Sequence, residues 1–439
     1  MKLNTKRTVL VGFAFLAICA FWQMYDNLVP KILTETFGIG ESVSGVIMAS
    51  DNVLALFLLP LFGGLSDKCK SKLGRRRPFI LFGTLASVAL MMALPLLTDS
   101  YYAQPESWKI AAFVACLGGL LVAMGTYRSP AVALMPDVTP KPLRSKANAI
   151  INLMGAVGGI LYLVVSSVLY TSAPGVYASY LPLFAIVGAV MLIALAIIMF
   201  CVNEPKLVAE QKAYEEAHPE DNLTEVTESG EALPADVKKS LSFLLASIAL
   251  WFIGYNGVTT WFSVYAQNTW GMTLGQANTC LTIATAGAIV SYIPVGIVAS
   301  KIGRRKTIRF GTLLLSGCFF LAFGYTMISN SFSPVLYVLF MLVGLAWASI
   351  NVNSLPMVVE MCRGSDVGKF TGYYYTASMT AQIITPILAG TLLKNVGYFI
   401  LFPYAAFFVA LSFVTMLFVK HGDTKADAKK GLNSFEDMD

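Results

Sequence analysis

GGLSDKCKSKLGRRRPFI, residues 63–80, is the stretch that decides the fold. It is a short basic segment between two long apolar runs, and it carries six cations and a single acid, Asp67. A loop this basic between two membrane spans is expected on the cytoplasmic side of the membrane. A shorter copy, SKIGRRKT at residues 300–307, recurs in the second half of the chain. The two segments together predict the orientation of the chain and indicate an internal duplication.

The composition is that of a membrane protein. The chain has 439 residues, of which 56% are hydrophobic and only 13% are charged, whereas a soluble protein carries roughly 25% charged residues. The charges are clustered, and the runs between them reach the length of about 20 residues that a spanning helix needs. We therefore predict an all-α, polytopic fold with twelve spans at approximately 8–29, 42–64, 78–98, 109–136, 147–170, 179–201, 240–266, 277–299, 307–328, 334–360, 370–392 and 397–419.

The distribution of cations predicts the topology. With the N-terminus inside, 27 of the 31 lysines and arginines fall on the cytoplasmic side, which is a strong positive-inside pattern. Both termini are then cytoplasmic, and the first span is expected to be retained because it does not end in a small-residue cleavage site. The predicted organisation is an N-terminal six-helix bundle, a polar cytoplasmic linker, a C-terminal six-helix bundle and a cytoplasmic tail, at 1–201, 202–239, 240–419 and 420–439 respectively.

Several classes of function find no support in the sequence. The seven cysteines form no CxxC pair and suit small apolar positions inside spans, so neither a disulfide nor a metal site is predicted. Both histidines, His218 and His421, lie outside the predicted spans, which excludes a histidine proton relay within the membrane. The net charge of +6 lies in short interhelical loops and does not suggest nucleic acid. Without a phosphate loop or a nucleophile–base pair, we expect no enzyme and no cofactor.

Three charged residues lie at or near membrane depth in the first half. Asp51 is near the middle of the second span, Arg128 lies in the fourth span, and Asp26 lies near the outer part of the first. An ionisable residue at such a depth is costly and is by default a candidate for function. Two structural alternatives remain open, namely Asp51 as a partner for Arg128 and Asp26 as an exposed helix-end acid. Arg128 needs an acid or an acceptor-rich ligand.

The second half offers neutral rings and amides instead of charge. WFIGYNGVTTWFSVYAQNTW at 251–270 and TGYYYTASMTAQ at 371–382 combine aromatic and hydrogen-bonding side chains. Such a combination suits a sugar or an aromatic ligand, although packing and an aromatic belt at the interface are equally good explanations for any single residue. The wall of a cavity in this half is expected to be neutral.

The two halves can be aligned in the same orientation. Gly74-Arg75-Arg76 matches Gly303-Arg304-Arg305, and a shared Phe-Gly-Thr-Leu follows in both copies at 82–85 and 310–313. RSPAVALMPD at 128–137 resembles NVNSLPMVVE at 351–360, which places Asp137 over Glu360 and Arg128 over Asn351. Six spans repeated across a linker are the architecture of a two-lobed secondary transporter.

The loop GGLSD…LGRRRPFI resembles the loop 2–3 signature of the major facilitator superfamily, with a longer spacing between Asp67 and Gly74. That longer form is similar to the sucrose–proton symporters and their proton-coupled sugar transporter relatives. A looser similarity links PAVALMPDVTP to the glycoside–pentoside–hexuronide symporters. The resemblance implies alternating access by two pseudo-symmetric halves, coupled to an ion gradient.

The resemblance also implies ion pairs that hold the cytoplasmic side shut. Asp67 is expected to pair with Arg75 or Arg76, or to cap a neighbouring helix. Analogous gate contacts are expected at the two other inner ends; they are Asp137 with Arg144, and Glu360 with Arg363. The alternative for the basic loop is that it only enforces topology, and the lone acid within it argues for a further role.

The leading hypothesis is a proton–sugar symporter of the cell membrane that works as a monomer and takes a disaccharide or glycoside. Asp51 beside Arg128 suits a carboxylate that gains and loses a proton, with Asp26 as a further ion-coupling residue. The residues expected to hold the sugar are Trp22, Asp26, Asn27, Arg128, Asn256, Trp261, Asn351, Tyr374 and Gln382. Sodium coupling remains open. An exporter of drugs or amphipathic cations is disfavoured by Arg128, and a transport-like sensor or membrane enzyme is the remaining alternative.

Overall fold

The computed structural model describes residues 4–139, 144–170, 177–217, 234–329, 331–361 and 367–422. Within these residues, twelve helices are long and apolar enough to cross a membrane, so the predicted number of spans is confirmed. The apolar runs become helices because a spanning segment must satisfy its own backbone hydrogen bonds in hydrocarbon. The chain is a multi-pass membrane protein.

Most of the helices are longer than the apolar runs that predict them. In the first half they are α1 (Thr5–Lys31) with its π-helical extension η1 (Ile32–Thr36), α2 (Glu41–Asp67), α3 (Arg77–Ala103), α4 (Ser107–Asp137), α5 (Arg144–Leu169), α6 (Leu181–Cys201) and the short α7 (Glu204–Ala217). In the second half they are α8 (Ala235–Trp270), α9 (Leu274–Ile302), α10 (Arg304–Ile328), α11 (Val335–Val359), α12 (Val367–Val396), the short 3₁₀ helix η5 (Tyr398–Ile400) and α13 (Leu401–Leu417). Of these helices, α6, α11 and α13 are slightly shorter than the runs that predict them.

The ends of the helices have local causes. Gly271 adopts a left-handed conformation with φ of 60° and closes α8, as glycine commonly does after a helix. Thr273 and Gln276 then form a capping box, in which each side chain accepts a hydrogen bond from the other residue's backbone N–H, and α9 begins. The turn between these two spans is therefore encoded in three residues.

Small residues let helices of the first half approach closely. A Cβ atom on Gly158 of α5 would lie 2.0 Å from the carbonyl oxygen of Leu16 on α1, and one on Gly155 would lie 2.8 Å from the sulfur of Cys19. Glycine at these positions allows the two helices to pack closely, because a side chain there would collide with the neighbouring helix. This packing holds α5 against α1, the helix that carries Trp22 and Asp26.

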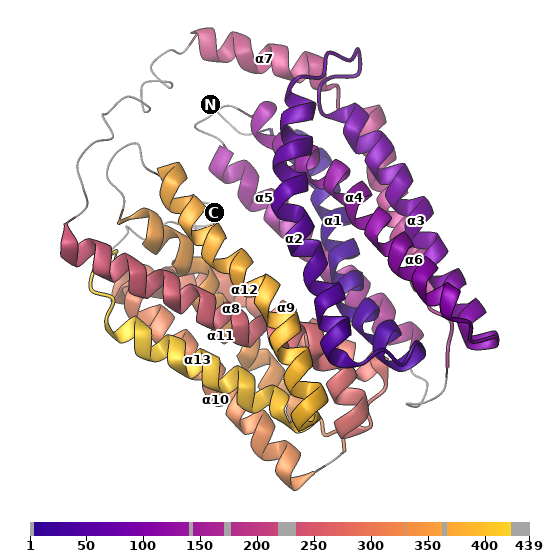
Figure 1. The fold of residues 1–439 in the computed structure, drawn as a ribbon. Coiled ribbons are helices and arrows are strands. Elements are labelled where there is room, and N and C mark those ends of the chain that lie inside the picture. Colours follow the sequence, from indigo (N-terminus) through magenta and orange to yellow (C-terminus); the bar gives the residue numbers. More distant parts are fainter. Residues whose placement is uncertain are drawn as a thin grey trace. The chain divides into compact units, whose positions relative to one another are not determined.

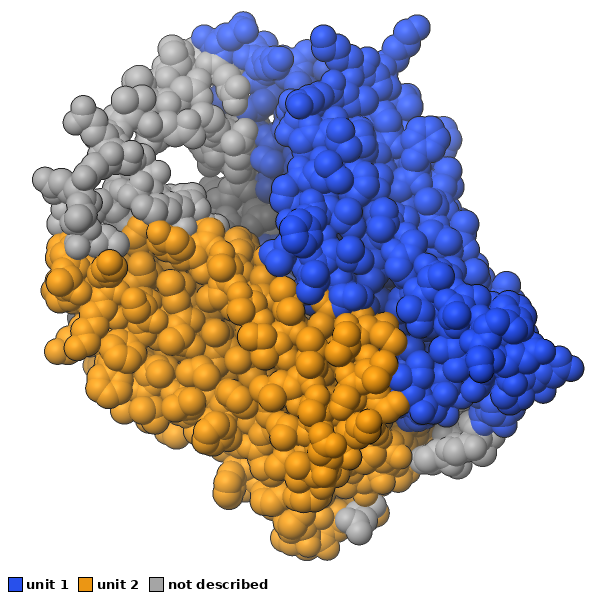
Figure 2. Space-filling view, viewed as in Figure 1, with its two compact units in different colours: residues 1–39, 50–166, 175–223 blue, residues 40–49, 167–174, 224–439 orange. Residues whose placement is uncertain are grey.

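The chain divides into two compact units (Figures 1 and 2). Unit 1 comprises residues 1–39, 50–166 and 175–223, and unit 2 comprises residues 40–49, 167–174 and 224–439. Among the described residues of unit 1, extensive contacts join α3 to α4, α1 to α6 and α3 to α6. In unit 2 they join α9 to α11, α10 to α11 and α8 to α13.

Two short segments from the first half of the sequence belong to unit 2. The phenol of Tyr398 donates a 2.6 Å hydrogen bond to Glu41 at the start of α2, and the N–H of Gly275 donates a 2.7 Å bond to the carbonyl of Tyr170. The start of α2 and the end of α5 therefore belong to unit 2, although the rest of both helices belongs to unit 1.

Candidate functional site

Unit 1 gathers aromatic and ionisable side chains from three helices. Trp22 and Asp26 follow one another at the i, i+4 spacing on α1, Asp51 comes from α2, and Arg128 comes from α4. The guanidinium carbon of Arg128 lies 5.5 Å from the centroid of the Trp22 ring, within the range of a cation–π contact. Along the described chain, no carboxylate comes within ion-pair distance of Arg128. We call Trp22, Tyr25, Asp26, Asp51 and Arg128 the unit 1 cluster.

The charges of the unit 1 cluster do not cancel. Asp26, Asp51 and Arg128 are all within electrostatic reach of one another. The carboxylate of Asp51 accepts hydrogen bonds from the backbone N–H of Asn52 at 2.5 Å and from its side-chain amide at 2.7 Å. Two ionised carboxylates near one guanidinium leave one negative charge uncompensated, which a proton or a cation can neutralise.

Two buried donors of the unit 1 cluster have no acceptor within the described residues. They are the indole N–H of Trp22 and the phenol of Tyr25, whose side chain is 1% exposed. A buried donor without an acceptor costs free energy, about 1–3 kcal/mol by mutational data, unless a ligand or water accepts from it. The donors and the carboxylates suit a ligand rich in hydroxyl groups, because a hydroxyl both donates and accepts.

Asn27, which the sequence predicts as a sugar-binding residue, is hydrogen-bonded to a neighbouring helix. Its side chain is 2% exposed, and its carbonyl oxygen accepts a 2.8 Å hydrogen bond from the phenol of Tyr162 on α5. This bond adds to the glycine contact that fixes α5 against α1. Asn27 therefore supports the position of Asp26 on its own helix.

Unit 2 holds a second, neutral cluster. The ring of Tyr255 on α8 stacks on Trp347 of α11 with a centroid distance of 3.7 Å and an angle of 5° between the planes. The amide nitrogen of the neighbouring Asn256 is buried, and no group of the described chain accepts from it. Tyr292 of α9 and Asn351 of α11 share a side-chain hydrogen bond. We call Tyr255, Asn256, Tyr292, Trp347 and Asn351 the unit 2 cluster.

Only part of the unit 2 cluster is predicted from the sequence. Asn256 and Asn351 are among the expected sugar-binding residues, whereas Tyr255, Tyr292 and Trp347 are not. The signal for Trp347 is present, because it precedes Asn351 by four residues on one helix. Its stacking partner could not be deduced, since the packing of α8 against α11 is not visible in either segment.

The other expected sugar-binding residues of unit 2 lie elsewhere on their helices. Trp261 is fully buried, a Cβ atom on Gly390 of α12 would lie 2.9 Å from its ring, and its indole N–H finds no acceptor among the described residues. Tyr374 shares a 3.2 Å hydrogen bond with the hydroxyl of Ser354. Gln382 is half-buried on α12.

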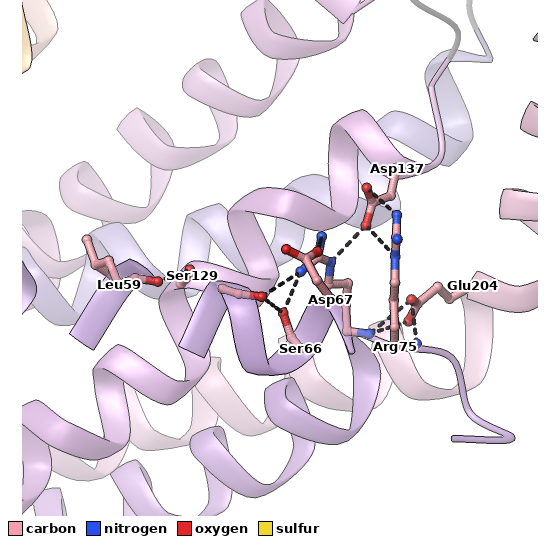
Figure 3. A network of polar contacts seen from close by, with 9 residues as sticks. Leu59, Ser66, Asp67, Arg75, Ser129, Asp137 and Glu204 are labelled. Carbon is pink, nitrogen blue, oxygen red and sulfur yellow. Dashed lines mark hydrogen bonds and ion pairs between the residues drawn. The ribbon is translucent and has the colours of Figure 1, made fainter. Parts of the chain in front are cut away.

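The basic loop of unit 1 is held by a network of ion pairs (Figure 3). Asp137, at the end of α4, accepts from Arg75 at 2.8 and 3.2 Å and from Arg76 at 2.8 Å. Arg76 also forms an ion pair with Asp67, the acid that the sequence singles out, and contacts the hydroxyl of Ser66. The expected partner of Asp137, Arg144, has a side chain that lies outside the described residues.

Glu204, which sequence reasoning missed, is the central acceptor of this loop. It is 1% exposed and accepts from the backbone N–H groups of Arg75, Arg76 and Arg77, at 2.8, 2.9 and 3.0 Å respectively. These are orphan donors at the start of α3, so the carboxylate caps that helix from another element. Gly74 makes room for it, since a Cβ atom there would lie 2.3 Å from a Glu204 oxygen.

Glu204 also begins α7, which lies crosswise at the basic-loop end of unit 1 (Figure 1). A second contact ties the same helix down, because Arg7 pairs with Glu210 at 2.8 Å. The start of the region that the sequence predicts as a polar linker is therefore docked on unit 1. No local pattern signals this, since the partners of Glu204 are backbone groups.

A second network occupies the corresponding end of unit 2. Glu360 forms an ion pair with Arg304, the first residue of α10. Arg305 donates to the backbone carbonyls of Val419 and Lys420 at 3.3 and 3.4 Å, after the end of α13. Arg363, the partner that the resemblance suggested for Glu360, lies outside the described residues.

No cluster of the described chain suits a transition metal. No group of three or more His, Cys, Asp or Glu side chains is arranged to hold a metal ion among the described residues. The six cysteines that are described are all free thiols. The chemistry available is therefore that of carboxylates, a guanidinium, aromatic rings and amides.

Proteins with similar sequences match only part of this chain. The sucrose transport protein SUC3 of Arabidopsis thaliana is 34% identical over 152 residues, which are 32% of this chain and 25% of the relative. The sucrose transport protein SUT4 of Oryza sativa subsp. indica is 25% identical over 229 residues, which are 47% of this chain and 37% of the relative. The matches thus span about a quarter to two fifths of the lengths of these relatives.

Solved structures match over almost the whole chain. A bacterial homologue of the iron transporter ferroportin has a TM-score of 0.69 at 12% identity and covers 95% of this chain and 99% of its own. A D-xylose-proton symporter has a TM-score of 0.66 at 16% identity, with 94% and 98% covered. At these identities the likeness shows the fold alone.

The sequence profile of the Major Facilitator Superfamily matches residues 11–276 and 266–436, which together span nearly the entire chain. The twelve spans, the repeated basic loop and the likeness to solved transporters agree with this match. The chain therefore belongs to the Major Facilitator Superfamily of membrane transporters.

Proposed function

We propose that the protein is a proton-coupled sugar symporter that works by alternating access. The observation that carries the proposal is the unit 1 cluster, in which Asp26 of α1 and Asp51 of α2 lie within electrostatic reach of Arg128 of α4. Protonation of one carboxylate balances the charge of the cluster, and loss of that proton restores a carboxylate that Arg128 can attract. Such a site links proton binding to the position of one arginine.

The sugar is the substrate that suits the two clusters best. Unpaired donors at Trp22, Tyr25 and Asn256 and the aromatic rings around Trp347 are what a polyhydroxylated ring needs for hydrogen bonds and stacking. The sucrose transport proteins among the relatives support the same class. The residues proposed to bind sugar are Trp22, Tyr25, Asp26 and Arg128 in unit 1, and Tyr255, Asn256, Trp347 and Asn351 in unit 2.

The ion-pair networks are proposed to stabilise one state of the transport cycle. Asp67, Arg75, Arg76 and Asp137 would act together in unit 1, and Glu360 with Arg304 in unit 2. The orientation with both termini in the cytoplasm, the residence in the cell membrane and the two six-helix halves at 1–201 and 240–419 are part of the same proposal.

Uptake into proteoliposomes tests the proposal. Radiolabelled sucrose, with other disaccharides as a panel, is offered with and without an inward proton gradient, and a protonophore serves as the control. We expect accumulation that requires the gradient and collapses with the protonophore. Equilibration that ignores the gradient would contradict proton coupling, and accumulation driven by a sodium gradient alone would favour the sodium alternative.

Export of amphipathic cations is the competing function that the cluster disfavours. Arg128 of the unit 1 cluster would repel a cationic substrate. A resistance assay in cells that express the protein separates the two, since a sugar symporter is expected to give no protection against cationic drugs.

A further inference from the structure

Unit 2 carries an apolar groove that the proposed transport function does not use. It lies between α9, α10 and α11, has a volume of about 350 Å³, and is lined among others by Pro294, Val298, Ile302, Phe310 and Leu345. This volume is at the lower end of ligand pockets, which measure about 300–1,000 Å³. It suits a segment of a hydrocarbon chain.

The wall of the groove presents only apolar surface. Its two hydroxyl residues direct their oxygens to their own helices, because Thr307 donates to the carbonyl of Gly303 at 3.0 Å and Ser349 donates to that of Leu345 at 2.9 Å. A ligand in the groove therefore finds no hydrogen-bonding partner there. Only a hydrocarbon occupant is matched to such a wall.

The groove opens on the surface of unit 2. Val298, Ile302 and Phe310 are exposed by 46%, 46% and 53% respectively, although each is a large apolar residue. α9 and α10 are membrane-spanning helices, so the neighbours of this surface are the hydrocarbon chains of lipids. An acyl chain can reach the groove from the side without crossing the protein.

Two cations lie at the loop end of the groove. Lys301 follows Val298 by three residues on α9, and Lys306 precedes Phe310 by four on α10, so each shares a helix face with a residue of the groove wall. Both lysines are exposed, and no ion pair joins them to the described residues. The arginines between them are occupied, with Arg304 held by Glu360 and Arg305 by backbone carbonyls.

We propose that this groove is a binding site for an anionic phospholipid of the leaflet that borders Lys301 and Lys306. One acyl chain lies between α9 and α10 over Leu345, and the phosphate and its anionic headgroup contact Lys301 and Lys306. The charge complementarity selects an anionic over a zwitterionic lipid, because each lysine near the membrane surface contributes about 1 kcal/mol of attraction to anionic lipid. The site is separate from the sugar and proton clusters.

Native mass spectrometry of the purified full chain tests the proposal. The protein is released from nanodiscs that contain phosphatidylcholine and phosphatidylglycerol, and the lipids that it retains are counted and titrated. We expect one phosphatidylglycerol molecule to bind with distinctly higher affinity than phosphatidylcholine. Equal retention of both lipids contradicts the role of the lysines, and retention of neither contradicts the site.

Two sets of substitutions test the contacts with the lipid headgroup and with the acyl chain separately. Lys301→Gln with Lys306→Gln should weaken binding of phosphatidylglycerol about 30-fold, from the loss of two lysine contributions. Val298→Trp should fill the groove and abolish the tight site. Both changes are at exposed positions, so monodisperse protein with unaltered melting is expected, and unchanged lipid retention in either variant overturns the proposal.

Matched controls exist on the same unit. Lys238→Gln with Lys239→Gln removes the same charge from exposed positions of α8, and Val290→Trp adds the same ring at a 75% exposed position of α9 outside the groove. Both controls should retain phosphatidylglycerol like the unaltered protein. Loss of the lipid in the controls would show that net charge or surface area, and not the groove, determines retention.

Discussion

The guanidinium of Arg128 rests over the ring of Trp22 at 5.5 Å and has no carboxylate at ion-pair distance within the described part of the chain. A cation–π contact of this kind contributes about 0.5–2 kcal/mol, which is less than a buried, hydrogen-bonded ion pair can supply. Arg128 is therefore held near Asp26 and Asp51 without being locked to either of them. An arginine held in this way can change its position when a neighbouring carboxylate gains or loses a proton.

The charge balance of the unit 1 cluster gives the first prediction. Arg128→Gln leaves Asp26 and Asp51 without the nearby cation, and a buried carboxylate without a compensating charge is costly. We expect loss of transport and a lowered melting temperature in detergent. Addition of Asp51→Asn should recover much of the stability but not the transport, and a double variant that melts even lower would contradict charge balance.

Arg128→Lys separates charge from geometry. Lysine keeps the positive charge but loses the planar group that lies over the Trp22 ring and that can bind acceptors in a bidentate manner. We expect a stable protein in which sugar uptake falls at least about tenfold, the equivalent of about 1.4 kcal/mol. Normal uptake by this variant would mean that Arg128 provides only charge.

Trp22 is expected to contribute a hydrogen bond to the substrate. Trp22→Phe retains a ring under Arg128 but removes the unpaired N–H, so KM for the sugar should rise roughly three- to tenfold with little change in the maximal rate. Trp108→Phe is the matched control, because Trp108 is 61% exposed and lies outside the cluster. An unchanged KM for Trp22→Phe would exclude the N–H as a ligand contact.

Glu204 should matter to stability far more than its position in a polar linker suggests. Glu204→Ala removes the acceptor for three backbone N–H groups and should cost about 1–3 kcal/mol, measured by thermal unfolding. Glu210→Ala on the same helix removes only the partly exposed pair with Arg7 and should cost about 0–1 kcal/mol. Equal effects of the two changes would contradict the capping role.

One pH effect lies outside the spans. A hydrogen bond from Lys109 lowers the pKa of Glu106, and a hydrogen bond from Trp108 lowers it further. Because the pKa is lowered in the folded protein, this stabilisation is present above the ordinary Glu value of about 4.3 and is lost as the pH falls through the lowered value. The effect is small because Glu106 is solvent-exposed.

Melting curves of the unaltered protein and of Glu106→Gln over a pH series measure this contribution. The two melting temperatures should differ slightly at neutral pH and converge in acid. A difference that grows as the pH falls would have the opposite sign and would exclude the assigned hydrogen bonds as its cause.

The spanning helices can be predicted from the sequence because long apolar segments are a strong signal for them. Each run long enough to span hydrocarbon becomes a helix, and Asp51 and Arg128 lie within spanning helices as the runs predict. The role of Glu204 could not be predicted, since it binds backbone N–H groups that every residue carries. The stack of Tyr255 on Trp347 also escaped prediction, because it depends on which faces of α8 and α11 pack together.

The proposal that Asp51 carries the coupled proton is tested most directly by Asp51→Asn in proteoliposomes, with gradient-driven accumulation and sugar counterflow measured on the same preparation. We predict that Asp51→Asn abolishes accumulation while counterflow persists, because a permanently neutral side chain still permits the conformational cycle but carries no proton. Asp51→Glu, which restores a carboxyl group, should recover part of the accumulation. Normal accumulation by Asp51→Asn would contradict the account and would leave Asp51 a structural residue.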